Sequence, residues 1–143
     1  MKTTFKIILC FLSIYWLNSS CSQDDLPVLV IEDYFTTIDE NPINDQLIGT
    51  IPSELNSNRE LYYSFTIISQ SVEKAIILGN GGYFSTEMIS IYVNDAAVFD
   101  FETNTVIMAT IKVNAVSYKL DFSQEIHDTK TITVTVNLND LAD

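Results

Sequence analysis

The sequence predicts an all-β domain, a sandwich of about seven antiparallel strands with Greek-key connections, behind an N-terminal targeting segment. Two observations predict the sandwich. Short segments rich in Val, Ile, Thr, Tyr and Phe recur after residue 27, and turn residues separate them. In the last of these segments, Thr131–Leu138, apolar and polar residues alternate as in a strand with one buried face. No stretch after the targeting segment shows a sustained helical period.

The expected strands follow one another at short intervals. Residues 21–35 are expected to form a tether that leads into a first strand, the apolar run Val28–Ile31 after Pro27. The later strands are expected at Leu47–Ile51, Leu61–Ile68, Ala75–Leu78, Ile89–Val93, Val106–Val113 and Thr131–Leu138. The run Gly79-Asn80-Gly81-Gly82 marks a turn. This spacing is typical of the immunoglobulin-like architecture.

Residues 1–20 resemble a lipoprotein signal peptide. Lys2 and Lys6 provide a positive start, the run Ile7–Leu17 is apolar apart from Ser13, and Asn18–Ser20 lead to Cys21. The resemblance implies cleavage before Cys21 and lipidation of that residue, and the acidic stretch that follows favours the outer surface of an outer membrane. An ordinary cleaved signal peptide, a retained membrane anchor and the periplasmic face are the alternatives.

The charge and the cysteines narrow the function classes. Lys and Arg number 7 against 19 Asp and Glu, a net charge of −12, so a nucleic-acid partner is not expected and cations are attracted. Both cysteines, Cys10 and Cys21, precede the domain, which excludes a disulfide or a cysteine metal site within it. The single histidine, His127, is expected in a solvated loop.

Four motifs occur in a particular order. They are Ile38-Asp39-Glu40-Asn41-Pro42 with Gly49-Thr50 after it, Leu61-Tyr62-Tyr63-Ser64-Phe65, Phe99-Asp100-Phe101-Glu102, and Asn137-Leu138-Asn139-Asp140. Their order and spacing resemble the cadherin repeat, in the divergent form of bacterial surface proteins. In that family the corresponding motifs are Glu-Asn-x-Pro with Gly-Thr, a Tyr-Ser pattern, Leu-Asp-Tyr-Glu and Asp-x-Asn-Asp. The resemblance covers residues 36–143 and implies a cadherin-like domain over that range.

The resemblance also implies a calcium site at one end of the sandwich. Its ligands would be Glu40, Asp100, Glu102, the carbonyl of Asn139, and Asp140. Calcium takes about 6–8 oxygen ligands, and lone extracellular modules bind it weakly, at about 10⁻⁴–10⁻³ M. Independently of the family, two acids two residues apart point the same way on an extended strand, as Asp100 and Glu102 would.

The sequence departs from the family pattern at three places. Asn137 stands where the family has an acid, and the acids expected near Ser53–Ser57 and near Asn114 are missing. These are the residues that would receive calcium from a preceding repeat. The retained residues therefore correspond to half of a site between two repeats.

These observations favour a non-catalytic protein of the cell surface. The leading hypothesis is a lipid-anchored module for calcium-dependent, homophilic adhesion or surface binding, whose partner is another surface protein, an identical domain or a polysaccharide. The alternatives are an accessory envelope lipoprotein and a carbohydrate-binding sandwich without calcium, for which Tyr62, Tyr63, Tyr83, Tyr92 and Tyr118 would supply the aromatic surface. A hydrolase is disfavoured because no nucleophile and base are arranged for one.

Overall fold

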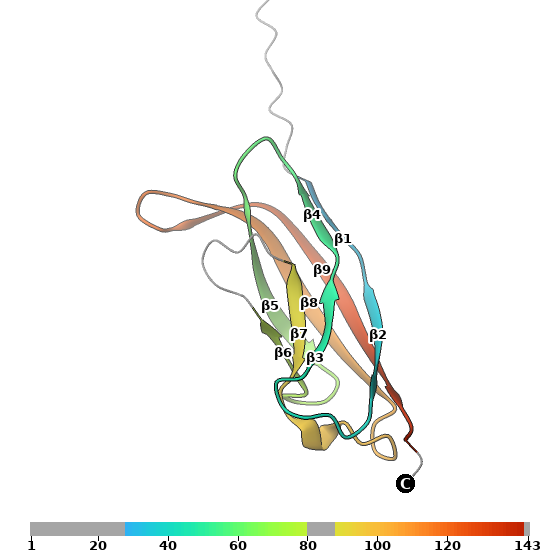
Figure 1. Cartoon of the computed structure of the whole chain (residues 1–143). Helices are drawn as coiled ribbons and strands as arrows, with labels where there is room; N and C mark the ends of the chain where they lie inside the picture. Colours follow the sequence, from blue (N-terminus) through green and yellow to red (C-terminus); the bar gives the residue numbers. More distant parts are fainter. Residues whose placement is uncertain (1–27, 80–87, 142–143) are drawn as a thin grey trace, which may run out of the picture.

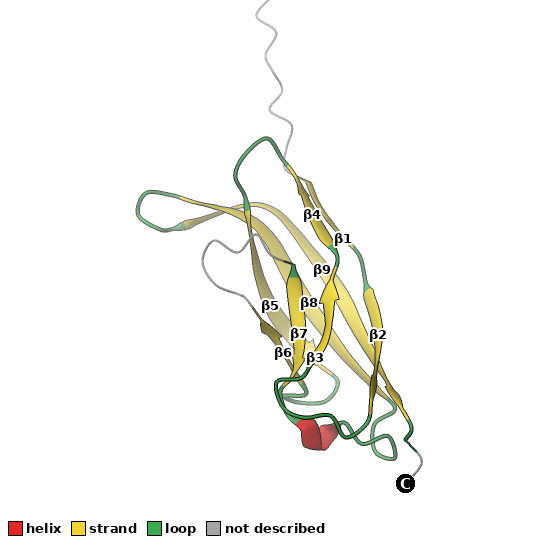
Figure 2. Cartoon of the chain, viewed as in Figure 1, coloured by secondary structure: helices red, strands yellow, loops and turns green. Residues whose placement is uncertain are grey.

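This computed structural model describes residues 28–79 and 88–141, which contain nine strands, one short helix and the loops between them. The strands are β1 (Val28–Ile31), β2 (Tyr34–Asp39), β3 (Leu47–Ile51), β4 (Ser53–Asn56), β5 (Tyr62–Gln70), β6 (Ile76–Gly79), β7 (Ile89–Val93), β8 (Val106–Tyr118) and β9 (Gln124–Asn139). The 3₁₀ helix η1 spans Ala96–Val98 (Figure 2). Among these residues, no helix has the length and hydropathy needed to cross a membrane.

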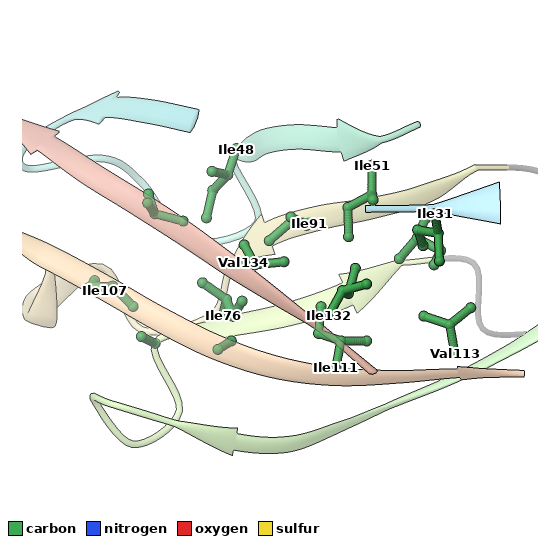
Figure 3. Close-up of a cluster of buried hydrophobic side chains, with 14 of the residues drawn as sticks. Ile31, Ile48, Ile51, Ile76, Ile91, Ile107, Ile111, Val113, Ile132 and Val134 are labelled. Atoms are coloured by element: carbon green, nitrogen blue, oxygen red, sulfur yellow. The ribbon is translucent and has the colours of Figure 1, made fainter. Parts of the chain in front are cut away.

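The strands form two main layers. One sheet has the order β2-β9-β8-β5 and the other β3-β7-β6, while β1 and β4 form a two-stranded ribbon beside them (Figure 1). Inward-facing residues of both sheets are buried in one cluster (Figure 3). On β9 these are the alternate residues that the sequence pattern selects, Ile132, Val134, Val136 and Leu138. The predicted all-β sandwich is confirmed.

The number of strands differs from the expected seven. The strands β3 and β7 have the bounds expected from the sequence, but β2 and β4 were not expected. Both are short and polar, with the sequences YFTTID and SELN, so neither carries a continuous apolar signal. Their backbones complete ladders with β9 and β1, and their contribution to the core is small: Ile38 is buried in it, and Tyr34 and Leu55 pack against it.

The parallel pairing of β2 with β9 brings the ends of these two strands to the same end of the sandwich. β2 runs parallel to β9, in register from Tyr34 with Val134 to Asp39 with Asn139. The last residues of both strands therefore meet at one end of the sandwich, next to the point where the chain leaves it. Figure 1 shows the start of β1 at the opposite end.

Gly49 closes one edge of the sandwich. It lies on β3, an edge strand of its sheet, and faces Tyr34 on β2, an edge strand of the other sheet. A Cβ atom at this position would collide with the Tyr34 hydroxyl and crowd its ring. The Gly-Thr motif thus provides the space in which a side chain from one sheet covers the edge of the other.

Candidate metal centre

The site is built where β2 and β9 end side by side. The backbone N–H of Glu40, the first residue after β2, donates to the carbonyl oxygen of Asn139 at 3.1 Å. The side-chain amide of Asn139 donates in turn to the Asp39 carboxylate at 3.0 Å. These bonds extend the parallel ladder by one residue and fix the direction in which the Glu40 side chain leaves the sheet.

Glu40 is the one buried charged residue in the part of the chain that the structure describes, with 4% of its surface exposed. Its Oε2 atom accepts a hydrogen bond from the N–H of Phe101 at 3.1 Å, and its Oε1 atom accepts one from the N–H of Leu141 at 2.7 Å. These bonds compensate for the loss of water around a buried carboxylate. Since a carboxylate offers about four lone-pair sites, both oxygens retain capacity to bind a cation.

The loop between β7 and β8 carries the other two carboxylates to Glu40. It is anchored by Phe99, which is fully buried in the core. The Phe99 carbonyl accepts a hydrogen bond from the N–H of Asn41 at 2.9 Å. Asn41 has a φ of 54°, in the left-handed region that Asn tolerates better than most residues. This conformation gives Asn41 of the Glu40-Asn41-Pro42 motif a structural role.

Asp100 and Glu102 come together through a turn, where the sequence suggested an extended strand. The Asp100 carboxylate accepts hydrogen bonds from the N–H of Glu102 at 3.1 Å and from the hydroxyl of Thr103 at 2.7 Å. The Asp100 carbonyl also accepts the N–H of Asn104 at 2.7 Å. Short Asp side chains favour such local bonds to the following backbone, which compete with strand geometry. The role of Thr103 was not predicted from the sequence, although an Asp followed three residues later by a Thr is a signal for such a turn.

Three of the five expected metal ligands lie together. Glu40, Asp100 and Glu102 each place one carboxylate oxygen within 4.8 Å of the other two. Glu40 is buried, Asp100 is half-buried and Glu102 is exposed, so the group opens to solvent on one side. Oxygens that share a calcium ion lie about 2.3–2.6 Å from it, which this spacing allows.

The electrostatics reflect this proximity. The hydrogen bond from the Thr103 hydroxyl lowers the pKa of Asp100. A hydrogen bond to Asp100 raises the pKa of Glu102, and the negative charges of Glu40 and Asp100 raise it further. Like charges at this distance favour proton retention by one member of the group. A divalent cation would relieve the same repulsion.

The other two expected ligands are Asn139 and Asp140. Asn139 is exposed, and its carbonyl accepts the Glu40 N–H with one of its two lone pairs, so that its role as a ligand stays a prediction. Asp140 is also exposed, and its carboxylate is not among the three that gather. The backbone around them still contributes, because the N–H of Leu141 holds Glu40 in place.

The remaining predicted features are dispersed. Cys21 and Tyr83 lie outside the described residues. Tyr63 is buried in the core, and the Tyr92 ring packs against Gly79. Tyr62 and Tyr118 pair at the opposite end of the domain, with ring centroids 5.6 Å apart. The described tyrosines therefore do not form one continuous aromatic surface.

No protein-family model matches the sequence, and no curated protein matches it. Solved structures do match. Human protocadherin-24 EC1-2 superposes with a TM-score of 0.61 at 10% identity, over 83% of this chain and 55% of that one. The human desmocollin-1 ectodomain gives a TM-score of 0.57 at 19% identity, over 82% of this chain and 22% of that one. Mouse protocadherin-24 EC1-3 superposes with a TM-score of 0.55 at 12% identity, over 81% of this chain and 35% of that one. The fold is that of a cadherin repeat.

The cadherin-like domain matches only part of these larger chains. It spans about half of the two-repeat protocadherin fragment and a smaller share of the longer ectodomains. In the cadherin-like domain the three carboxylates lie where the chain leaves the sandwich, at the end of β2 and β9. The resemblance noted from four short motifs thus extends to the three-dimensional fold.

Proposed function

We propose that this protein is a lipid-anchored, non-catalytic binding module of the outer-membrane surface, which uses calcium at the end of the domain farthest from its anchor. The observation that carries the proposal is the gathering of Glu40, Asp100 and Glu102 at that end. Three carboxylates are hard oxygen ligands of the kind that calcium prefers. The chain enters the sandwich at the opposite end, towards which an anchor at Cys21 would lie.

The open side of the group suggests how such a module would bind. Three carboxylates leave several of calcium's coordination positions to other oxygens. Water would fill these positions in the free domain, and oxygens of a partner would replace it in a complex. The partner would be another surface protein, an identical domain or a polysaccharide, and a bound ion would bridge the two surfaces. The cadherin-like fold supports a surface role but does not select the partner.

Calcium titration of the purified, processed protein tests the proposal. A ligand that binds the folded state raises the melting temperature by mass action. We expect a saturable rise in Tm with millimolar calcium, a smaller rise with magnesium, and loss of the effect in Glu102→Ala. The matched control is Glu54→Ala, which removes an exposed glutamate on β4, at the other end of the sandwich. This variant should respond to calcium like the parent.

Two other results would change the proposal in different ways. If Tm does not respond to several millimolar calcium, the acidic group is not a calcium site, and an accessory envelope lipoprotein or a calcium-independent carbohydrate-binding sandwich becomes the better hypothesis. The anchor is tested separately by the mass of the N-terminal peptide. A cleaved chain whose Cys21 carries no lipid would contradict the anchoring while leaving the calcium result intact.

A further inference from the structure

The hairpin formed by β8 and β9 extends beyond the rest of the sandwich. β5 pairs with β8 only as far as Tyr62 with Val116, whereas β8 and β9 continue to pair as far as Tyr118 with Gln124. The register shifts beside Val116, which leaves His127 as an extra residue on β9. Such a bulge bends a ladder and increases its twist. Figure 1 shows the hairpin swinging out to the side of the sandwich, in the half where β1 begins.

His127 supports this bend. It was expected in a loop, but it lies on β9, half-buried, with its Nε2 atom 2.7 Å from the hydroxyl oxygen of Ser117 on β8. The bond joins the two strands just beyond the bulge, on the side of the tip. The hairpin is therefore an ordered extension of the sheet, held by backbone pairing and by the contact between His127 and Ser117.

The tip of the hairpin exposes two large apolar side chains. The Leu120 side chain is fully exposed, and Phe122 has 68% of its surface exposed. The turn between them is well bonded, because the N–H of Phe122 donates to the Lys119 carbonyl at 2.9 Å. The Asp121 carboxylate accepts both the N–H and the hydroxyl of Ser123, at 3.0 Å and 2.6 Å. These polar groups of the turn thus form hydrogen bonds with one another.

Phe122 occupies a position that suits glycine. Its φ is 62°, in the left-handed region, where a bulky side chain is a genuine outlier. Three-residue hairpin loops usually place Gly at such a position. The fold gains little from this ring, since most of its surface faces solvent. A strained, exposed aromatic residue is therefore better explained by contact with another molecule.

The position of the hairpin points to a lipid surface as that molecule. β1 begins beside the base of the hairpin, where the N–H of Leu29 donates to the Asp128 carboxylate at 2.9 Å. Cys21 lies only seven residues before Val28, and a connection of seven residues spans at most about 25 Å. A lipid at Cys21 would hold this half of the domain close to the bilayer, while the acidic group lies at the opposite end.

We propose that Leu120 and Phe122 insert into the surface of the bilayer that holds the lipid of Cys21, and so give the domain a second point of attachment. This proposal rests on the lipid anchor of the proposed function. Transfer of the Leu and Phe side chains out of water lowers the free energy, and Lys119 beside them can keep its ammonium group in the headgroup layer. Asp121 stays charged because the Ser123 hydroxyl lowers its pKa, so insertion is shallow. With this contact the domain lies inclined towards the hairpin side.

Tryptophan fluorescence of the processed, lipidated protein on vesicles tests the contact. The single Trp of the sequence, Trp16, lies in the segment expected to be cleaved, so Phe122→Trp introduces a unique reporter. In vesicles of phosphatidylcholine with brominated acyl chains, we expect a blue shift and strong quenching of this reporter. The matched control is Phe35→Trp, since Phe35 is 69% exposed and belongs to β2, which lies on the side of the sandwich away from the hairpin (Figure 1). Its emission should stay red-shifted and unquenched.

The remaining measurements separate this proposal from the anchor. Leu120→Trp is a second reporter and should be quenched like Phe122→Trp, which guards against a local effect of one substitution. Flotation with vesicles tests the anchor by itself. If the protein does not float, a maleimide lipid coupled to Cys21 supplies the anchor, because Cys21 is the one thiol of residues 21–143. Equal emission from positions 122 and 35 on the vesicles, with either anchor, would overturn the proposal.

Discussion

The two ends of the domain treat their side chains in opposite ways. At the end where β2 and β9 stop, Glu40 is buried and its two oxygens receive two backbone N–H groups. At the hairpin tip, Leu120 and Phe122 are exposed although they are apolar. Each end thus holds side chains in the environment that is normally unfavourable for them. Hydrogen bonds within the fold compensate for the burial of the Glu40 carboxylate. No comparable interaction within the fold compensates for the exposure of Leu120 and Phe122.

The fold depends more on the acidic end than on the hairpin tip. Glu40 joins the end of β2, the loop before β8 and the residues after β9, so that the acidic end is part of the stability of the domain. The hairpin tip contacts mainly itself through its turn. Substitutions at the two ends should therefore affect stability in opposite directions.

The largest expected effect is the loss of stability in Glu40→Ala. The N–H groups of Phe101 and Leu141 lose their acceptor, and the cost is about 3 kcal/mol in the free energy of unfolding. Denaturant unfolding in calcium-free buffer measures it. Glu102→Ala is the control, because Glu102 is exposed and should change the stability of the calcium-free domain little. Equal effects of the two variants would show that Glu40 does not brace this end.

The next effect is a pH dependence of calcium binding. The pKa of Glu102 is raised above the ordinary 4.5, so the calcium-free domain retains this proton at a higher pH than an ordinary glutamate does. A raised pKa in the folded state adds stability at acid pH that is lost as the pH rises through it. Calcium must displace the proton, so its affinity should fall about tenfold for each pH unit below that pKa.

Calorimetric titration at a series of pH values measures this dependence. Asp100 should not contribute in the same range, because its pKa is lowered and it remains ionised to more acid pH. The Glu102→Gln variant should bind calcium more weakly, and its calcium affinity should no longer depend on pH around the pKa of Glu102. A parent protein whose calcium affinity is constant down to the ordinary pKa of a glutamate would contradict the coupling between the two carboxylates.

The smallest expected effect is a gain of stability at the other end. Phe122→Gly relieves the left-handed conformation of a bulky residue and should stabilise the domain by about 1 kcal/mol, after the entropy that glycine adds to the unfolded chain. Thermal unfolding of the purified protein measures the change. Phe35→Gly is the control, since the same loss of an exposed ring from β2 should destabilise the strand. A Phe122→Gly variant less stable than the parent would mean that the tip packs into the fold after all.

The strands that face the core could be predicted from the sequence, and those that do not could not. β7 matches its predicted bounds because buried residues alternate over its whole length. β1 and β3 match theirs because each is a short apolar run that follows turn or polar residues. β8 and β9 were predicted too short, ending at Val113 and starting at Thr131. On β9 the missing residues are mostly exposed and belong to the hairpin, so they show no apolar alternation. On β8 they include Ala115 and Val116, which are both buried although they are adjacent, and this breaks the alternation. Hydrophobic periodicity records burial, and strands that are paired but not buried leave no such record.

The candidate site divides in the same way. The acids themselves and their oxygen chemistry were evident from the motifs around Glu40 and Asp100. Their meeting depends on the parallel pairing of β2 with β9 and on the turn that Thr103 closes, which bring together residues about 60 positions apart. Local motifs do not encode that pairing. Asp140 was expected in the group from the resemblance of its motif to the family's, but its carboxylate is not among the three that lie within 4.8 Å of one another.

The all-β class, the core-facing residues of the central strands and the acidic character of the domain follow from the sequence alone, because local alternation and composition carry this information. The burial of Glu40, the turn of Asp100 and Glu102 towards it, and the exposure of Leu120 and Phe122 at the other end become visible only in the folded domain. Burial and proximity between distant residues arise from the pairing of strands far apart in the chain, and that pairing is fixed by the packing of the whole sandwich.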